Sequence, residues 1–244
     1  MNATSLEIAE IIQYVCDLGD IQMMHVYEAM KHAYKGQGWI DGNEGRRLPT
    51  VAEVAEAVEE VESGAKGKNA RARLTPLTDF GLFRDEIGGV FDAAGDGYGL
   101  ILDVSKVALE SVQRAAAAFV LRKVYRQMFK TGPTNLMKLA VVLDEAHRSA
   151  KDATLPKLMK EGRKYGISVV VASQQIADFH SDVIGNAGMK IIFHTNFPDS
   201  RKVAGFLRSK QGQDLSAQIE QLGVGEAFVS LPDSPVARKL YMLP

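Results

Sequence analysis

The spacing of apolar residues changes near residue 97. Before that point, apolar side chains recur every three or four residues, as on one face of a helix, over 5–35, 51–61 and 69–80. After it, short apolar runs alternate with helical patterns, an order typical of a parallel sheet with right-handed crossover helices. We therefore predict an α/β protein with an all-helical subdomain at 1–90 and an α/β core at 91–244.

Turn and cap signals set the expected limits of these elements. The break Leu18-Gly19-Asp20 divides 5–35 into two helices, and Thr50 with Glu53 forms a capping box before the helix at 51–61. The alanines at 115–118 suggest close packing of a long helix on the sheet. In the core we expect strands at 98–104, 139–143, 167–172, 189–194, 226–231 and 236–242, and helices at 107–130, 155–165, 178–186, 199–207 and 214–222.

Polar residues follow two of the predicted strands directly. The run Leu139–Leu143 is apolar and partly β-branched, which predicts a strand buried on both faces, and it ends in Asp144-Glu145-Ala146-His147. The run 167–172 ends in Ser173-Gln174. If the strands are parallel, these polar residues meet at the carboxyl edge of the sheet, where open α/β sheets bind ligands. Gly166, in the position after the helix at 155–165, is a favourable helix terminator.

Composition narrows the class of protein without assigning a function. With 244 residues, 46% of them hydrophobic and 24% charged, the chain has an ordinary globular composition. No apolar run is long enough for a membrane span and the amino terminus lacks the order of a signal peptide, so we expect a cytoplasmic protein. The single cysteine, Cys16, is expected to be a buried structural thiol.

The net charge of −1 shows no overall excess of basic residues that would indicate nucleic-acid binding. A translocase can nevertheless confine its phosphate contacts to a few residues. Basic residues on the helix at 107–130 could contact DNA, but a solvated outer helix face is the ordinary explanation. These residues are Arg114, Arg122, Lys123, Arg126 and Lys130.

Four motifs in this order resemble the carboxyl-terminal part of the HerA/FtsK superfamily of P-loop ATPases. They are Val-Val-Leu-Asp-Glu-Ala-His at 141–147, Glu-Gly-Arg-Lys-Tyr-Gly at 161–166, Val-Val-Val-Ala-Ser-Gln-Gln at 169–175, and Asn-Ala-Gly-Met-Lys-Ile-Ile-Phe at 186–193. The resemblance implies a RecA-like, mostly parallel sheet flanked by helices, and 1–90 would be the helical insertion that follows the P-loop. It also implies a hexameric ring that uses ATP and Mg²⁺ to move duplex DNA, and a nuclease or another DNA-processing protein would be a fitting partner.

The resemblance assigns roles to individual residues. Asp144 resembles the Walker B aspartate, which holds Mg²⁺ through water, and Glu145 the general base that polarises the attacking water. Gln174 occupies the position of the polar sensor that contacts the γ-phosphate or the lytic water, with Ser173 and Gln175 as neighbours. Arg163 looks like the arginine supplied to the neighbouring subunit, and Lys164 is the substitute candidate.

Each residue also has a plain structural explanation. Asp144 could cap the next helix, Gln174 could be an ordinary loop glutamine, and Arg163 could be a surface arginine favoured by the helix dipole. His147 is as well explained by an ordinary hydrogen bond as by coupling of nucleotide state to DNA. Arg201 and Arg208 could face an interface, but nothing in their spacing separates them from solvated charge.

The phosphate-binding motif Gly-x-x-x-x-Gly-Lys-Ser/Thr is missing from this sequence. The nearest run, Gly-Ala-Lys-Gly-Lys at 64–68, has only two residues between its glycines and no hydroxyl after the lysine. The chain is therefore expected to be either part of a longer ATPase or a split or degenerate copy.

Three functions follow from these observations. The leading one is part of a hexameric HerA-type DNA translocase that carries the Walker B, sensor and arginine elements. The alternative is a non-catalytic interaction module that lends Arg163 to a partner's active site. A helicase of the Asp-Glu-Ala-His box class rests on 144–147 alone and is the weakest of the three.

Overall fold

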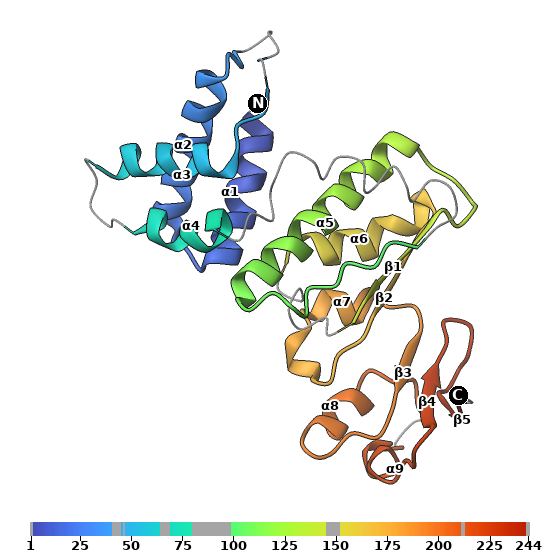
Figure 1. Ribbon diagram of the computed structural model, residues 1–244. Coiled ribbons are helices and arrows are strands. Elements are labelled where there is room, and N and C mark those ends of the chain that lie inside the picture. The colour runs from blue at the N-terminus through green and yellow to red at the C-terminus, as the bar shows by residue number, and fades with distance from the viewer. Residues whose placement is uncertain are drawn as a thin grey trace. The chain divides into compact units, whose positions relative to one another are not determined.

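The computed structural model describes residues 2–40, 45, 47–63, 69–79, 99–144, 152–210 and 213–242 (Figure 1). The chain divides into two compact units, Met1–Lys123 and Val124–Pro244. The predicted domain boundary near residue 90 falls in 80–98, which lie outside the described residues, and it stays a prediction.

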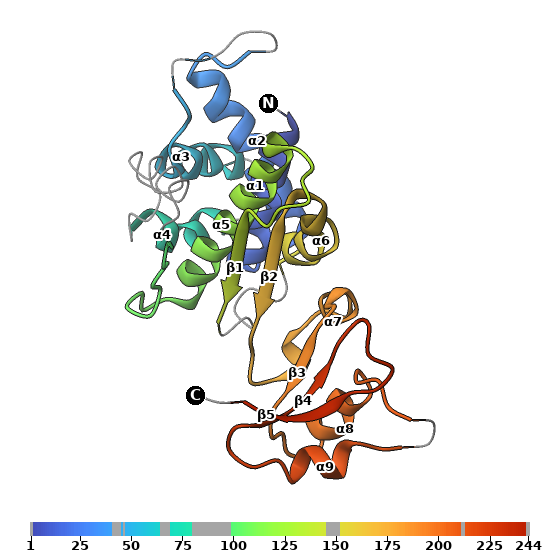
Figure 2. The same ribbon diagram turned by 90° about the vertical axis from the view of Figure 1, so that its right-hand side faces the viewer.

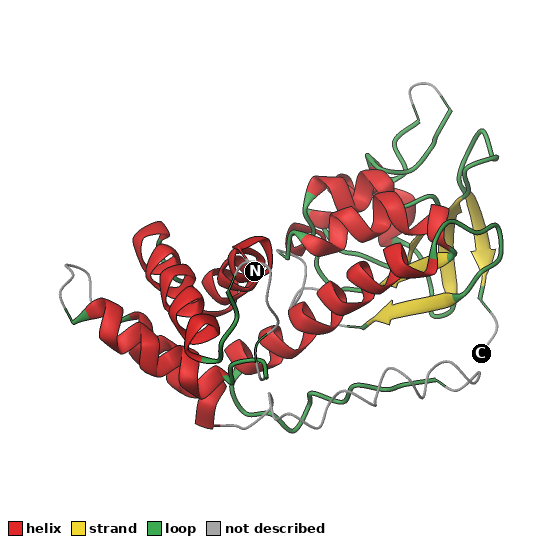
Figure 3. Ribbon diagram, turned by 90° about the horizontal axis from the view of Figure 1, so that it is seen from above, coloured by secondary structure: helices red, strands yellow, loops and turns green. Residues whose placement is uncertain are grey.

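The first unit is helical in its described residues (Figure 3). Its core is formed by buried apolar residues from every helix, among them Val15, Val26, Val58, Leu74 and Val112, each fully buried. The unit comprises α1 (Asn2–Cys16), α2 (Asp20–Gly36), α3 (Val51–Glu62), α4 (Ala70–Asp79) and the first part of α5 (Glu110–Thr131). The predicted helices at 5–35, 51–61 and 69–80 are therefore confirmed over the described residues.

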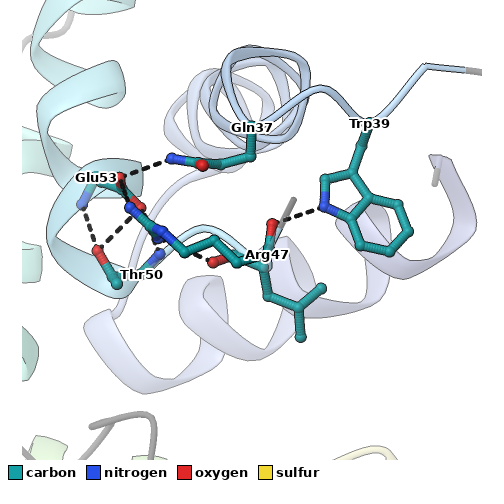
Figure 4. Close-up of polar contacts among 6 residues, drawn as sticks. Gln37, Trp39, Arg47, Thr50 and Glu53 are labelled. Carbon is teal, nitrogen blue, oxygen red and sulfur yellow. Dashed lines mark hydrogen bonds and ion pairs between the residues drawn. The ribbon is translucent and has the colours of Figure 1, made fainter. Parts of the chain in front are cut away.

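The predicted capping box at the start of α3 is confirmed. The Thr50 hydroxyl accepts from the backbone N–H of Glu53 at 3.2 Å, and the Glu53 carboxylate accepts from the backbone N–H of Thr50 at 2.8 Å. Two further donors reach the same carboxylate, namely the Arg47 guanidinium and the Gln37 amide (Figure 4). Trp39 adds a bond from its indole N–H to the Arg47 carbonyl at 2.7 Å. Glu53 therefore connects the start of α3 to the residues that follow α2.

The first part of α5 packs on other helices. Ala115 and Ala118 are buried in the core of the helical unit, so the expectation that they pack on the sheet is wrong. Small side chains allow close approach to a sheet or to another helix. The sequence alone does not show which of the two they pack against. Arg114 pairs with Asp17 at 3.3 Å, and Arg122, only 9% exposed, pairs with Glu7 at 3.4 Å. These two arginines therefore have structural contacts within this unit.

The second unit contains all the described strands, in two sheets (Figure 2). Parallel strands β1 (Leu139–Leu143) and β2 (Ile167–Val171) form one sheet, and antiparallel strands β3 (Lys190–Ile192), β4 (Glu226–Ser230) and β5 (Arg238–Tyr241) form the other. The helices of this unit are the end of α5, α6 (Thr154–Glu161), a 3-10 helix (Gly162–Tyr165), a short 3-10 turn (Ile176–Asp178), α7 (Ser181–Asn186), α8 (Asp199–Ala204) and α9 (Ser216–Glu220).

The parallel pairing of β1 and β2 around a crossover helix confirms the central prediction for the core. Other expectations fail among the described residues. Residues 99–104 form no strand, and β3 pairs with β4 instead of joining β1 and β2. The chain is thus an α/β protein with one parallel pair, and the described residues do not form a single mostly parallel sheet.

The expectation that β1 is buried on both faces is also wrong. Val142 is 66% exposed and Val170, its partner on β2, is 50% exposed. Val141, Leu143, Val169 and Val171, on the alternate row, are half-buried. An apolar run shows that a strand suits a buried position, but its burial depends on neighbours, and a two-stranded sheet has few of them.

Candidate functional site

The carboxyl ends of β1 and β2 lie at one edge of their sheet. Leu143 and Val171, the last residues of the two strands, are paired, and the N–H of Ala172 donates to the carbonyl of Leu143 at 2.9 Å. Asp144 follows β1 immediately, and Ser173 and Gln174 follow β2 after one further residue. Because the strands are parallel and in register, the structure brings these three polar residues to the same edge, as the sequence predicted.

The side chains at this edge can be reached from solvent. Asp144 and Gln174 are exposed and Ser173 is half-buried. The Ser173 hydroxyl accepts from the N–H of Gln175 at 3.4 Å, which bends the chain after β2. Among the described residues, this edge therefore carries one carboxylate and one amide that solvent can reach, while their roles stay predictions. Glu145 and His147, the other polar residues predicted here, lie outside the described residues.

The turn between α6 and β2 is fixed by a glycine. Gly166 has φ of +73°, in the left-handed region, and a Cβ atom there would lie 2.2 Å from the carbonyl oxygen of Leu136. Its own carbonyl accepts from the N–H of Lys138 at 2.7 Å, and the carbonyl of Lys164 accepts from the N–H of Thr134 at 3.0 Å. These bonds fasten the 3-10 helix that carries Arg163 to the segment that leads into β1.

An aromatic cluster supports the same 3-10 helix from the side of α5. The rings of Tyr125 and Phe129 meet edge to face at 5.1 Å, and Phe129 meets Tyr165 at 5.2 Å. The Tyr125 hydroxyl also donates to the Glu161 carboxylate of α6 at 3.2 Å. Sequence reasoning missed this cluster, although the spacing of four residues between Tyr125 and Phe129 is a usable signal for one helix face.

Arg163 lies at the opposite end of the sheet from Asp144. It stands in the 3-10 helix just before β2 begins, whereas Asp144 follows the end of the parallel strand β1. A five-residue strand spans roughly 16 Å, so the two side chains belong to opposite edges. Arg163 is exposed, while the ammonium of Lys164 lies over the Tyr165 ring at 5.6 Å. Of the two basic residues, Arg163 is the better placed to act on another molecule.

The residues at the carboxyl edge fit one part of a magnesium nucleotide site. Mg²⁺ prefers oxygen ligands and is usually held by one or two carboxylates together with substrate phosphates. Asp144 offers such a carboxylate, and no cluster of three or more His, Cys, Asp or Glu that could hold a metal occurs in the parts of the chain that the structure describes. The backbone cradle for the phosphates is not encoded in this sequence.

Three other predicted residues have contacts that bear on their roles. Arg208 donates to the carbonyls of Pro232 and Ser234, which gives it a structural role. Arg201 is exposed on α8 and helps to lower the pKa of the Asp214 carboxyl, after the stronger effect of hydrogen bonds from Ser216. Cys16 is buried, and burial raises the pKa of its thiol to about 11, so it is an unreactive structural thiol, as expected.

Comparison with known proteins found a family model and several HerA proteins that match parts of this chain. The family described as the TraM recognition site of TraD and TraG matches residues 138–204, which include β1, α6, β2 and β3. The DNA double-strand break repair helicase HerA of Saccharolobus solfataricus is 27% identical over 184 residues, which are 68% of this chain and 37% of the relative. A probable HerA of Methanocaldococcus jannaschii is 29% identical over 96 residues, 36% of this chain and 19% of the relative.

A solved structure extends the likeness to the whole chain. The bacterial conjugative coupling protein TrwBdeltaN70 aligns with 100% of this chain and 68% of its own, with a TM-score of 0.64 at 14% identity. Together, the family match and the HerA relatives support a place for this chain in the HerA/FtsK superfamily of P-loop ATPases. The chain spans 19% and 37% of the lengths of the two HerA proteins. Among its described helices, none combines the length and apolar character that a membrane span requires.

Proposed function

We propose that this chain is the carboxyl-terminal part of a HerA-type, hexameric ATPase that moves along duplex DNA. The observation that carries the proposal is the placement of Asp144 and Gln174 at one carboxyl edge of a parallel strand pair in a HerA/FtsK chain. The HerA relatives are DNA repair helicases by name, which supports DNA as the substrate class.

In this proposal the polar edge handles the nucleotide. The Asp144 carboxylate would hold the water shell of Mg²⁺, which neutralises charge on the phosphates of ATP when bound. Glu145, the next residue, would orient and deprotonate the attacking water, and the Gln174 amide would contact the γ-phosphate or that water. The rest of the RecA-like core, including the phosphate cradle, would come from the remainder of the assembly.

Arg163 would serve a neighbouring subunit. Its position at the opposite edge from Asp144 keeps it away from the nucleotide of its own chain, and its exposure leaves it open to a neighbour. A planar guanidinium is well suited to stabilise charge that develops on a transferred phosphoryl group. A site completed by residues from two subunits requires an oligomer, and we propose a hexameric ring.

The test is Mg²⁺-dependent ATP hydrolysis by this chain, with and without duplex DNA, beside the variant Glu145→Gln. For a motor that is complete in this chain we expect DNA-stimulated turnover that the variant loses while it still binds nucleotide. For a chain that needs its phosphate cradle from elsewhere we expect no turnover until an ATPase that supplies the cradle is added. A Glu145→Gln variant that hydrolyses ATP at the normal rate would refute the base assignment.

The alternative is a non-catalytic subunit that completes a partner's active site. The missing phosphate-binding motif and the outward position of Arg163 both favour it. Adding this chain to an ATPase that has the cradle should then raise the rate of that partner, and Arg163→Ala should remove the gain while Lys164→Ala keeps it. Stimulation that survives Arg163→Ala would exclude this role for the arginine.

A further inference from the structure

The end of α5 lies beside α6 and the 3-10 helix that follows it, within the second unit (Figure 1). Tyr125 contacts Glu161, and four residues further along both segments Phe129 contacts Tyr165. The two segments therefore run in the same direction and touch along one line.

One side of this contact line is buried and the other is open to solvent. On α5, Val124 and Met128 are buried. On the neighbouring segment, Leu158 and Gly162 are buried. Residues three or four positions apart share a helix face, so the exposed residues that flank the line share the opposite, outer side. We name this outer side the basic aromatic face, and it consists of Phe129, Arg126, Lys130, Lys157, Lys160 and Lys164.

The lysines of the basic aromatic face lack acidic partners. On other surfaces of the chain, Lys31, Lys202 and Lys239 each pair with a carboxylate within 3.2 Å. The carboxylate at the contact line, Glu161, accepts from the Tyr125 hydroxyl. Like charges three or four positions apart repel each other, so an anion bound here would relieve this repulsion. In the described part of the chain no ion pair is formed by Lys130, Lys157, Lys160 or Lys164.

An aromatic ring lies among these positive charges. Phe129 is 47% exposed, although its ring is held edge to face by Tyr125 at 5.1 Å and by Tyr165 at 5.2 Å. Proteins that bind single strands combine cations along the phosphate backbone with aromatic rings on which bases stack. In a duplex the bases stack on one another, so a side chain of this kind is useful only to unpaired bases. The exposed ring thus distinguishes this face from an ordinary solvated helix surface.

We propose that the basic aromatic face binds single-stranded nucleic acid, with phosphates along Arg126, Lys130 and Lys160 and a base stacked on Phe129. Arg163 is not part of this site, because it lines an open groove beside β2. The inference goes beyond the proposed function, which assigns duplex DNA as the substrate that is moved and uses none of these residues. Its test contains no ATP and no Mg²⁺, so it fails or succeeds independently of hydrolysis.

The first experiment compares two probes on the unmodified chain. A labelled oligothymidylate of about 12 nucleotides and an abasic strand of the same length carry the same phosphates, but the second strand has no bases. Fluorescence anisotropy should show saturable binding of the oligothymidylate and about five- to hundredfold weaker binding of the abasic strand. The affinities of both strands should fall with a similar slope as salt is added, since their phosphate contacts are the same.

Matched variants locate the binding face. Phe129→Leu removes the ring but stays apolar, so oligothymidylate binding should fall towards that of the abasic strand, while Phe129→Tyr should bind like the parent. Phe197→Leu, at a 71% exposed ring in the same unit, should have no effect. Lys130→Gln combined with Lys160→Gln should weaken both probes about three- to tenfold and reduce the salt slope, whereas Lys210→Gln should not. Circular dichroism verifies that each variant is folded.

Several results would overturn the proposal. Equal binding of the two single strands would show that no base is stacked, and this comparison needs no variant. Tighter binding of a duplex of the same length, or of polyglutamate of matched charge, would assign the face to another class of ligand. Equal losses in Phe129→Leu and Phe197→Leu would remove the site from this face, and so would absence of oligothymidylate binding at about millimolar concentration.

Discussion

Single residues set the position of Arg163, and Gly166 is the most constrained of them. Its φ is positive, and a Cβ atom at this position would collide with the carbonyl oxygen of Leu136, so a side chain has no room. We expect Gly166→Ala to destabilise the fold by about 1–3 kcal/mol, measured as a shift in the urea midpoint. Gly185→Ala is the control, because a Cβ there meets nothing within 4 Å, and it should be neutral or slightly stabilising. Equal effects of the two substitutions would contradict the strain argument.

Glu53 gives a prediction for pH dependence. Hydrogen bonds from Arg47, then from the backbone of Thr50, lower the pKa of its carboxyl from 4.5 to about 2. A carboxyl whose pKa is lower in the folded state stabilises the protein fully above the unfolded value, and this stabilisation is lost as the pH falls from 4.5 towards 2. In urea unfolding, Glu53→Gln should therefore be less stable than the parent at pH 7, and the difference should shrink towards pH 2. Glu56→Gln, on an exposed face of the same helix, should show no such convergence.

At the scale of whole elements, α4 depends on a side chain from another helix. The Glu62 carboxylate at the end of α3 is 5% exposed and accepts from the N–H groups of Asn69, Ala70 and Arg71, at 3.2, 3.0 and 3.3 Å. Burial raises the pKa of this carboxyl, but the bonds from these N–H groups and from His25 outweigh burial and lower it. Glu62 thus caps a helix that begins eight positions further along the chain.

Removing this cap tests the account. Glu62→Gln keeps the size of the side chain but loses its charge and turns an N–H group towards the donors of α4. We expect a loss of about 1–3 kcal/mol and faster amide exchange at Ala70 and Arg71. Glu60→Gln removes the same charge from an exposed position on α3 and should change neither quantity. Unchanged exchange at Ala70 in Glu62→Gln would show that the cap is not needed.

The elements also show how far the sequence can predict the fold. The positions of the helices, the Thr50–Glu53 box, the glycine stop at Gly166 and the parallel pair β1–β2 follow from local patterns, so they were predictable, whereas several helix limits differ by two or three residues. The partner of Ala115 and Ala118, the pairing of β3 and the exposure of Val142 depend on which distant element supplies the neighbouring surface. The hydrophobic pattern indicates that a surface suits burial and does not identify what covers it.

At the scale of the whole molecule, the placement of Asp144 and Arg163 at opposite edges predicts complementation between subunits. In an assembly that supplies the phosphate cradle, Glu145→Gln and Arg163→Ala should each abolish hydrolysis in uniform assemblies. Mixed assemblies should recover part of the activity, because an intact Arg163 can then face an intact Glu145. Steady-state ATPase assays across mixing ratios measure this, with Lys164→Ala as the control that should not need rescue. Absence of recovery at every ratio would contradict an arginine supplied in trans.

The candidate site, like the fold, was predictable where it depends on local patterns. The sequence places Asp144 and Gln174 together through strand polarity, since both follow parallel strands. The side of the sheet on which Arg163 stands follows from the same polarity once the pairing is known. The open groove lined by Met137, Met159, β2 and Met189 was not predictable, because its lining comes from four separate segments whose arrangement no local pattern encodes.

The cap on α4 also bears on where nucleic acid can bind. The first turn of a helix ordinarily attracts phosphate, since its N–H groups point outward with partial positive charge. In α4 those groups already hold the carboxylate of Glu62. The N–H groups of Asn69, Ala70 and Arg71 are therefore already occupied, and a phosphate of a DNA backbone would have to displace Glu62 to bind at this turn.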